Sequence, residues 1–316
     1  MSADKRINCV GILVVDALSG PLTEYPLPRV RSQVVTKSVR FAAGGGAANS
    51  SSALARMGLN VGVFSKVGDD PNGAFLRSEL GRCGVDTRGI RVDAAVTTPF
   101  TFVGVHADGE RTFIHTPGAN LSFSTADIDR EALLAADFLL YHDCWVLPAL
   151  DGAPAAELLA EARRRGVTTL LDECWGLGPK RDVLECMIPH CDYVLLSRDD
   201  LRAVYADWQP DRIADHVLGL GAGTAGIKMG AAGSLVATAG GRERFPALPA
   251  SVVDTTGAGD CWDAGFIAAL ARGEPLSRAA RIGHACAACC IEHVGGSAGI
   301  PDYRAVSARA GLEAGH

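Results

Sequence analysis

The sequence contains neither a long apolar segment nor an excess of basic residues. No run of about 18 uncharged apolar residues occurs, so a membrane-spanning helix is not expected. The polar segment 1–6 lacks the apolar stretch of a signal peptide, which favours a cytoplasmic location. The formal net charge is −6. Without a broad basic surface, the protein is not expected to have nucleic acid as a main partner.

Two common phosphate-binding motifs are missing as well. The glycines at 44–46 fit neither G-x-x-x-x-G-K-[ST] nor G-x-G-x-x-G. We also find no internal repeat, long linker or low-complexity tail. The 316 residues, 48% hydrophobic and 21% charged, have the composition of a globular protein with a sizeable core. These features favour one main domain, residues 1–316, over two independent domains.

Apolar segments of strand length alternate with segments of helical pattern along most of the chain. The expected strands are 7–15, 60–66, 138–141, 167–171, 193–196 and 225–229. The expected helices include one that ends at Gly58 and the segments 74–83, 121–136, 155–165 and 279–293. Repeated β–α units of this kind predict an α/β fold, with a doubly wound, mostly parallel sheet and helices on both faces.

Polar side chains follow several of these strands. Ligands of open α/β sheets bind at the carboxyl ends of the strands, so these residues are candidates for a binding crevice. They are Asp16, His142, Asp143, Asp172, Glu173, Ser197 and Asp200. Each acidic residue alone is also explained as a turn or cap residue, but the set as a whole weakens that explanation.

A second group of strands is expected outside this sheet. Segments 97–105 and 111–115 alternate apolar and polar residues around Asp108-Gly109, which predicts a hairpin. The stretch from residue 20 predicts a loop followed by a strand at 33–40. Together they predict a small β-sheet lid, from about 17–40 and 97–118, that excludes water during chemistry. Exposed edges of such a lid favour pairing with a second copy, which makes a homodimer the expected assembly.

Residues 252–265 combine a short β-branched strand, a turn with two glycines and the start of an apolar helix. Helix starts expose unpaired N–H groups and the positive end of the helix dipole, so they bind anions well. Asp260 at this start has two interpretations. It caps the helix, as Asp often does, or it acts as a base while the amides hold a ligand phosphate.

The cysteines raise a separate question. Cys286 and Cys289 form a C-x-x-C pattern within the alanine-rich segment 279–293, with His284 and His293 beside it. A metal or redox site is one interpretation. Buried packing is favoured, because free cysteine behaves as a small hydrophobic residue and no second ligand pair follows at zinc-finger spacing.

Two separated motifs, Gly44–Asn49 and Asp254–Asp260, resemble the two signatures of ribokinase-like (PfkB-type) sugar kinases. The likeness covers nearly the whole chain, including Asp16 and the closing segment 295–301. It implies transfer of the γ-phosphoryl group of ATP to a hydroxyl of a sugar or sugar derivative. By this resemblance, Asp260 corresponds to the general base of the family. The backbone amides of Gly257, Ala258 and Gly259 resemble the anion hole of the family.

The resemblance assigns further residues to ligands. The substrate positions are Asp16, Gly45, Gly46 and Asn49, to which we add Phe102, His115 and Asp143 from the lid and the strand ends. The ATP positions are Ser197, Lys228, Gly230, Gly233, Gly257, Gly259, His284 and Ala288. Asp200 is expected to hold Mg²⁺ through water. Asp254, Thr256, Gly295 and Gly299 fall where some members bind a monovalent cation, which makes K⁺ a further candidate.

The chain departs from the family pattern in places that bear on the substrate. Ser197-Arg198-Asp199-Asp200 stands where the family often has N-x-x-E, so the shell around Mg²⁺ is expected to differ. Val14 and Gly46 replace two polar residues of ribokinase, which disfavours ribose. An altered hexose, a keto-sugar acid or a sugar phosphate fits as well. Two other functions stay open: a nucleoside kinase of the same fold, and a catalytically weak regulator that binds nucleotide or sugar.

Overall fold

The computed structural model describes residues 5–22, 35–106, 111–174, 176, 178 and 180–312. Its main sheet has nine strands in the order β13-β12-β11-β10-β9-β8-β1-β4-β5. They are β1 (Arg6–Val10), β4 (Asn60–Gly68), β5 (Ile90–Asp93), β8 (Phe138–Cys144), β9 (Thr168–Glu173), β10 (Tyr193–Ser197), β11 (Thr224–Lys228), β12 (Ser234–Thr238) and β13 (Gly241–Phe245). Only the two pairs that involve β12 are antiparallel. The predicted doubly wound, mostly parallel sheet is therefore confirmed.

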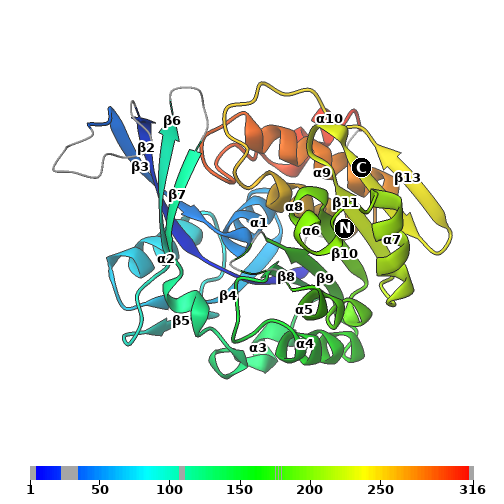
Figure 1. Ribbon diagram of the computed structural model, residues 1–316, viewed down its shortest axis with the longest axis horizontal. Helices are drawn as coiled ribbons and strands as arrows, with labels where there is room; N and C mark the ends of the chain where they lie inside the picture. Colours follow the sequence, from blue (N-terminus) through cyan, green and yellow to red (C-terminus); the bar gives the residue numbers. More distant parts are fainter. Residues whose placement is uncertain are drawn as a thin grey trace.

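Helices cover both faces of this sheet (Figure 1). They are α1 (Gly46–Arg56), α2 (Pro71–Arg82), α3 (Arg130–Leu134), α4 (Ala153–Arg164), α5 (Arg181–Glu185), α6 (Arg198–Tyr205), α7 (Pro210–Gly219), α8 (Ala258–Leu270), α9 (Leu276–Ile291) and α10 (Tyr303–Arg309). Leu140 belongs to the core under α1, α8 and α9. Its neighbours Leu139 and Tyr141 belong to the core on the other face, because successive side chains of a strand point in opposite directions. None of the helices in the described part of the chain is long and apolar enough to cross a membrane.

The first predicted strand, 7–15, is in fact two strands in two different sheets. β1 ends at Val10, and β2 (Val14–Leu22) begins a separate four-stranded sheet. The chain bends where a Cβ at Gly11 would lie 2.6 Å from Asp143 Oδ2, and Ile12 N donates to that oxygen over 2.9 Å. Asp16 is consequently the third residue of a strand in the small sheet. The prediction that it ends a strand of the main sheet is wrong.

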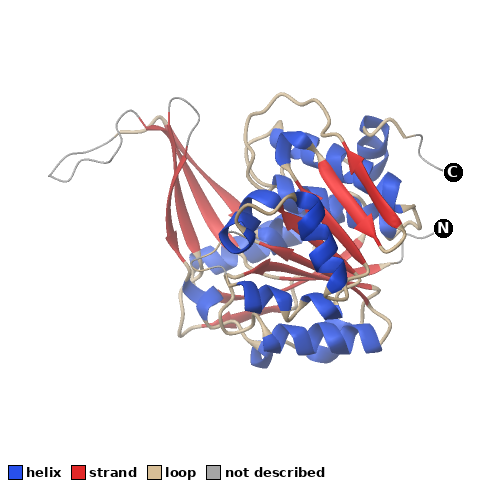
Figure 2. Ribbon diagram, turned by 45° about the vertical axis from the view of Figure 1, so that its right-hand side comes forward, coloured by secondary structure: helices blue, strands red, loops and turns tan. Residues whose placement is uncertain are grey.

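The small sheet has the order β3-β2-β6-β7, with β3 (Ser38–Gly44), β6 (Phe100–His106) and β7 (Arg111–Thr116) beside β2. Figure 2 shows that it projects from the main body. The predicted hairpin strands are confirmed, while the turn at 108–109 lies outside the described residues. The strand predicted at 33–40 is shifted along the chain: β3 begins at Ser38 and continues to Gly44, so it leads directly into the glycine motif, and residues 33 and 34 are not described.

Two local predictions fail. Segment 121–136 is not one helix: Ser124 caps a short 3₁₀ turn, η2 (Thr125–Asp127), and only α3 follows. The strand expected at Val252–Val253 does not form. These side chains are 63% and 56% exposed, so they have no sheet face to pack against, and β propensity alone does not make a strand.

Candidate active site

The glycine turn before α8 creates an open helix start. Gly257 has φ 73°, and a Cβ at this position would lie 2.6 Å from the carbonyl oxygen of Gly296, so only glycine fits. No side chain caps α8. The Ala258 amide donates to Thr255 O over 3.3 Å, which leaves the next amides of the first turn to a ligand. With the positive end of the dipole, this helix start favours an anion.

The carboxylate of Asp260 lies in this first turn and faces α1. Asp260 Oδ2 accepts a 2.7 Å hydrogen bond from Asn49 Nδ2, and the Asp260 carbonyl oxygen accepts one of 2.8 Å from Ser50 Oγ. The side chain does not cap α8, so the cap interpretation is wrong. The hydrogen bond from Asn49 fixes the orientation of the Asp260 carboxylate through one of its oxygens.

The glycine motif before α1 allows three polar groups to approach the backbone. A Cβ would lie 2.1 Å from Asp16 Oδ2 at Gly44, 2.4 Å from Ile12 O at Gly45, and 2.6 Å from Asp143 Oδ1 at Gly46. Side chains at these positions would displace Asp16 and Asp143. The motif therefore brings the two predicted substrate carboxylates next to the start of α1.

Asp143 joins three segments of the site. Its Oδ2 accepts from Ile12 N over 2.9 Å, and its Oδ1 accepts from Gly46 N over 3.1 Å. Its φ of 63° lies in a region that is costly for a residue other than glycine. Burial raises the pKa of Asp143 to about 7. The predicted substrate residue thus has a structural task, because both of its oxygens hold the backbone around the site.

Residues of the small sheet divide between its two faces. Asp16, Thr101 and His115 pair across neighbouring strands and therefore share one face. Thr101 Oγ1 lies 2.9 Å from His115 Nδ1, and burial raises the pKa of Asp16 to about 6. Phe102 follows Thr101 in β6, so its side chain points to the opposite face. Within one chain, the structure brings His115 but not Phe102 to the side of Asp16.

The predicted nucleotide residues near β11 form a tight turn. Lys228 ends β11, and η4 (Gly230–Ala232) connects it to β12. Gly230 and Gly233 have φ of 57° and 88°. A Cβ at Gly233 would lie 1.9 Å from Phe245 O. This turn therefore requires glycine, and its backbone lies open to a ligand at Gly230, where an added Cβ would meet nothing within 4 Å.

The last two of the residues assigned to ATP, His284 and Ala288, lie in α9 and are largely buried. His284 Nε2 is 2.8 Å from Ser234 Oγ, and burial lowers the pKa of His284 to about 4. Ala288 is 2% exposed. In the same helix, Cys290 Sγ donates to the carbonyl oxygens of Thr256 and Gly296. The cysteines at 286, 289 and 290 are buried, in keeping with the favoured packing interpretation.

Oxygen ligands for a divalent cation gather at the ends of β9 and β10. Glu173 Oε1 accepts a 2.7 Å hydrogen bond from Ser197 N, whereas Glu173 Oε2 is buried without a partner in the described part of the chain. Asp200 follows in the first turn of α6, where burial and the charge of Asp172 raise its pKa. Such carboxylates fit a hard cation that is held directly or through water.

Three of the four residues assigned to a monovalent cation lie together. Asp254 Oδ1 accepts from Thr256 N over 2.8 Å, and Asp254 Oδ2 accepts from Gly295 N over 3.0 Å. No contact of Gly299 with these three residues is seen in the described part of the chain; a Cβ at Gly299 would lie 2.1 Å from His293 Nδ1. The buried carboxylate of Asp254 and the nearby carbonyl groups are suitable oxygen ligands, so the first three residues fit a monovalent cation.

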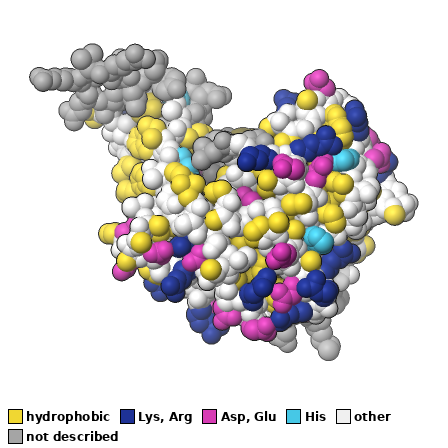
Figure 3. Space-filling view, turned by 60° about the horizontal axis from the view of Figure 1, so that its bottom comes forward, with side chains coloured by type: hydrophobic (Ala, Val, Ile, Leu, Met, Phe, Trp, Pro, Cys, Tyr) yellow, Lys and Arg dark blue, Asp and Glu magenta, His cyan; other side chains and the backbone are white. Residues whose placement is uncertain are grey.

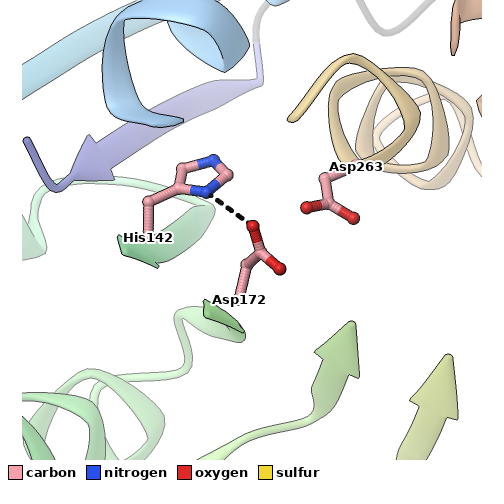
Figure 4. Close-up of side chains that lie close together, drawn as sticks. All are labelled: His142, Asp172 and Asp263. Atoms are coloured by element: carbon pink, nitrogen blue, oxygen red, sulfur yellow. Dashed lines mark hydrogen bonds and ion pairs between the residues drawn. The ribbon is translucent and has the colours of Figure 1, made fainter. Parts of the chain in front are cut away.

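A buried charged network under α8 was not predicted from the sequence. In Figure 4, the side chains of His142, Asp172 and Asp263 surround one space. The ammonium group of Lys228 lies there, 2.8 Å from Asp172 Oδ1 and 2.8 Å from Asp263 Oδ2. His142 Nδ1 lies 3.2 Å from Asp172 Oδ2. In the sequence, the feature that indicates a buried charge here is Asp263, an acidic residue within the otherwise apolar stretch 261–269.

The site has an anion-binding helix start, a carboxylate oriented beside it and a glycine turn at the next strand end. Together with the doubly wound sheet and its four-stranded extension, this geometry defines a kinase of the ribokinase fold. The chain belongs to the pfkB family of carbohydrate kinases, whose family model matches residues 4–303. It is an ATP-dependent kinase of a sugar or sugar derivative.

Three relatives illustrate the range of the family. The ATP-dependent ribose-1-phosphate kinase of Halopiger xanaduensis is 31% identical over 265 residues, which cover 83% of this chain and 84% of the relative. The aminoimidazole riboside kinase of Salmonella typhimurium is 32% identical over 281 residues, 82% and 84% of the two chains. Arabidopsis thaliana ribokinase, solved with ribose and ATP, matches with a TM-score of 0.85 at 23% identity, over 98% of this chain and 100% of that one.

Proposed function

We propose that Asp260 is the general base and that the first-turn amides of α8 bind the transferring phosphoryl group. The observation that supports this most is the 2.7 Å hydrogen bond by which Asn49 orients the Asp260 carboxylate beside the uncapped helix start. Asp260 takes the proton of the substrate hydroxyl, whose oxygen forms the new bond to the γ-phosphorus. The bond to the bridging oxygen breaks, and ADP leaves with its electron pair.

The substrate binds between this helix start and the lid face that carries Asp16 and His115. Asp16, with Asn49 and the backbone of Gly45 and Gly46, accepts and donates hydrogen bonds to sugar hydroxyls. Asp143 keeps these segments in place through Ile12 and Gly46. We propose that the four-stranded sheet closes over the bound sugar and excludes water.

Cations complete the proposed site. Asp200 and Glu173 would hold Mg²⁺, which supplies charge neutralisation for the phosphates. Asp254, Thr256 and Gly295 would hold K⁺ next to the turn that precedes α8. Ser197, Gly230 and Gly233 are the proposed contacts to ATP, and His284 and Ala288 are the proposed wall of the adenine site. Initial rates with and without Mg²⁺, and in KCl against NaCl, test the two cations separately.

A nucleoside kinase is the second candidate. Val103 pairs with Phe113 on the face that carries Asp16, and Phe113 is 46% exposed, so one aromatic ring is suitably located to stack on a base. ATP consumption over a panel of sugars, sugar acids, sugar phosphates and nucleosides decides between the candidates. Nucleosides as the only good substrates would favour the second, and no turnover of any compound would favour a binding regulator.

We also propose that two copies join through the lid. Val39, Phe41 and Ile114 are 55%, 52% and 55% exposed, and the last two share with Phe102 the face opposite Asp16. Figure 3 shows apolar side chains along this projecting region. A second copy would cover them. Light scattering tests this: a dimer mass is expected, Phe41→Ser should reduce it to the monomer mass, and a monomeric wild type would contradict the proposal.

Dependence on ATP favours a cytoplasmic location, which cell fractionation tests.

A further inference from the structure

The ammonium group of Lys228 lies directly against the first turn of α8. A Cβ added to Gly259 would lie 3.5 Å from Lys228 Nζ and 3.9 Å from Lys228 Cε. Outside the helix itself, no other described atom is within 4 Å of that point. Gly259 therefore leaves a small open space between the first-turn amides of α8 and a lysine from a different strand.

Two carboxylates hold Lys228 in this position. Asp172 Oδ1 and Asp263 Oδ2 each lie 2.8 Å from Lys228 Nζ. An ammonium group has three N–H donors, and these two contacts use two of them. Among the described residues the ammonium group has no third hydrogen-bond partner. We call Asp172, Asp263 and Lys228 the clamp. Asp263 is fully buried one turn after Asp260 in α8, so the clamp also connects the helix that carries the proposed base to strands β9 and β11.

Burial and neighbouring charges shift the pKa values of the groups around Lys228. Burial and the charge of Asp172 raise the pKa of Asp263 well above its usual range. Burial alone would lower the pKa of His142, but the hydrogen bond with Asp172 and the charges of Asp172, Asp143 and Asp260 raise it to about 9. Asp172 accepts a hydrogen bond from Lys228 at Oδ1 and lies 3.2 Å from His142 Nδ1 at Oδ2, so it keeps one partner when Lys228 is replaced.

We propose that Lys228 is a catalytic residue that contacts the transferring phosphoryl group from the side opposite the α8 amides. The proposal rests on the proposed function, because it takes the helix start as the phosphoryl site. As the hydroxyl oxygen bonds to phosphorus and ADP leaves with its electron pair, Lys228 donates a hydrogen bond to a non-bridging phosphoryl oxygen. It keeps its proton throughout, and Asp260 receives the hydroxyl proton. Asp172 and Asp263 are positioning residues for the ammonium group.

The main test is the pair of variants Asp263→Asn and Lys228→Met/Asp263→Asn. The double variant removes the ammonium without leaving two unpaired carboxylates, because Asp172 still has His142. We expect kcat of the double variant to be about 10²–10³-fold below that of Asp263→Asn, with the Kd for ATP within about fivefold. A double variant that is folded and has the kcat of Asp263→Asn would overturn the proposal. A weaker Kd with unchanged kcat would overturn it too.

Lys66 offers a matched control. It is another buried lysine between two carboxylates, with Nζ 3.0 Å from Asp93 and 3.2 Å from Asp127, and it belongs to β4 rather than to the phosphoryl site. Lys66→Met should lower the midpoint of thermal unfolding but leave kcat within about twofold of the wild type. An equally large loss of kcat in a folded Lys66→Met protein would overturn the assignment, because loss of any buried lysine would then have the same effect.

Gly259→Ala gives a measurement that does not depend on how the lysine variants fold. The added methyl group meets Lys228 at an ordinary contact distance of 3.5 Å, and alanine is favoured over glycine in a helix. It fills the space between the amides and the ammonium group, so kcat should fall by about 10²-fold or more. Unchanged kcat would overturn the proposal. Asp260→Asn serves as the reference: if it retains full turnover, the proposed function itself fails, whatever the lysine variants do.

Discussion

The two sides of the active site differ in how their polar groups are held. On the side of the main sheet, Lys228, Asp172 and Asp263 are buried and each contacts at least one of the others. On the side of the small sheet, β3 and β7 are largely exposed, and Phe41, Phe113 and Ile114 are about half exposed or more. Buried polar groups without partners are costly, so the first side is fixed before any ligand arrives. The second side has few such constraints and is free to close on a substrate. Chemistry is thus expected to depend on the first side and substrate choice on the second.

The largest effect should come from Asp260→Asn. The substitution is nearly isosteric and retains an oxygen that can accept from Asn49, so the fold should survive. Removing the base should lower kcat by about 10³-fold, within the usual range for general base catalysis. Initial rates with each substrate of the panel measure kcat, and circular dichroism verifies the fold. Turnover close to that of the wild type would mean that the main-sheet side does not supply the base.

Asp16→Ala should affect the side of the active site that the small sheet forms. Loss of a charged hydrogen bond to the substrate costs about 1.5–3 kcal/mol, which raises KM for the sugar about 10–100-fold. KM for ATP and the ATP-binding affinity should stay within a factor of two. Steady-state kinetics with each substrate varied in turn measure this. If KM for ATP rises by the same factor, the small sheet does not act on sugar binding alone, and the proposed division of roles between the two sheets is wrong.

Gly46→Ala tests how tightly the glycine motif is packed. Its new Cβ would lie 2.6 Å from Asp143 Oδ1, so the free energy of unfolding should fall by about 1–3 kcal/mol. Gly81→Ala in α2 is the matched control, because a Cβ there meets nothing within 4 Å and should stabilise the helix by about 0.5–1 kcal/mol. Urea denaturation of both variants measures the difference. Equal stabilities would mean that Asp143 moves aside at no cost.

The last effect concerns the pH dependence of stability. The pKa of His142 in the folded protein, about 9, lies above its ordinary value of 6.5. The folded state therefore holds this proton more tightly, and the resulting stability is fully present below pH 6.5 and lost as the pH rises towards 9. The free energy of unfolding should fall by up to about 1.4 kcal/mol per pH unit in this interval. His142→Gln should reduce the slope of urea denaturation midpoints against pH.

His284→Gln is the control for that measurement. Burial lowers the pKa of His284 to about 4 from 6.5, so neither its folded nor its unfolded form titrates mainly between pH 7 and 9. The slope should stay as in the wild type. If the slope of the denaturation midpoints against pH disappears in His284→Gln, or stays unchanged in His142→Gln, a group other than His142 causes the pH dependence.

The sequence by itself determined the repeated β–α units, because a parallel sheet buried on both faces requires long apolar strands and helices between them. It also determined the glycine turn before α8 and the glycines at 44–46. Gly45 and Gly257 have positive φ and lie against backbone oxygens, whereas Gly44 and Gly46 leave room for the side chains of Asp16 and Asp143. Local pattern did not determine where a strand changes sheet. Residues 7–15 are apolar except for Asn8 and Gly11, and the break at Gly11 occurs where the chain passes close to His142 and Asp143.

Tertiary structure alone decided the roles of individual polar residues. The sequence around Asp260 is compatible with a helix cap and with a base. The structure separates the two, because Asn49, more than two hundred positions away, donates a hydrogen bond to the Asp260 carboxylate. Phe102 and His115 looked equivalent in the alternating pattern, yet pairing with Asp16 places them on opposite faces. The clamp around Lys228 joins β9, β11 and α8. Electrostatic partners of this kind depend on distances between segments far apart in the chain, which neither periodicity nor spacing encodes.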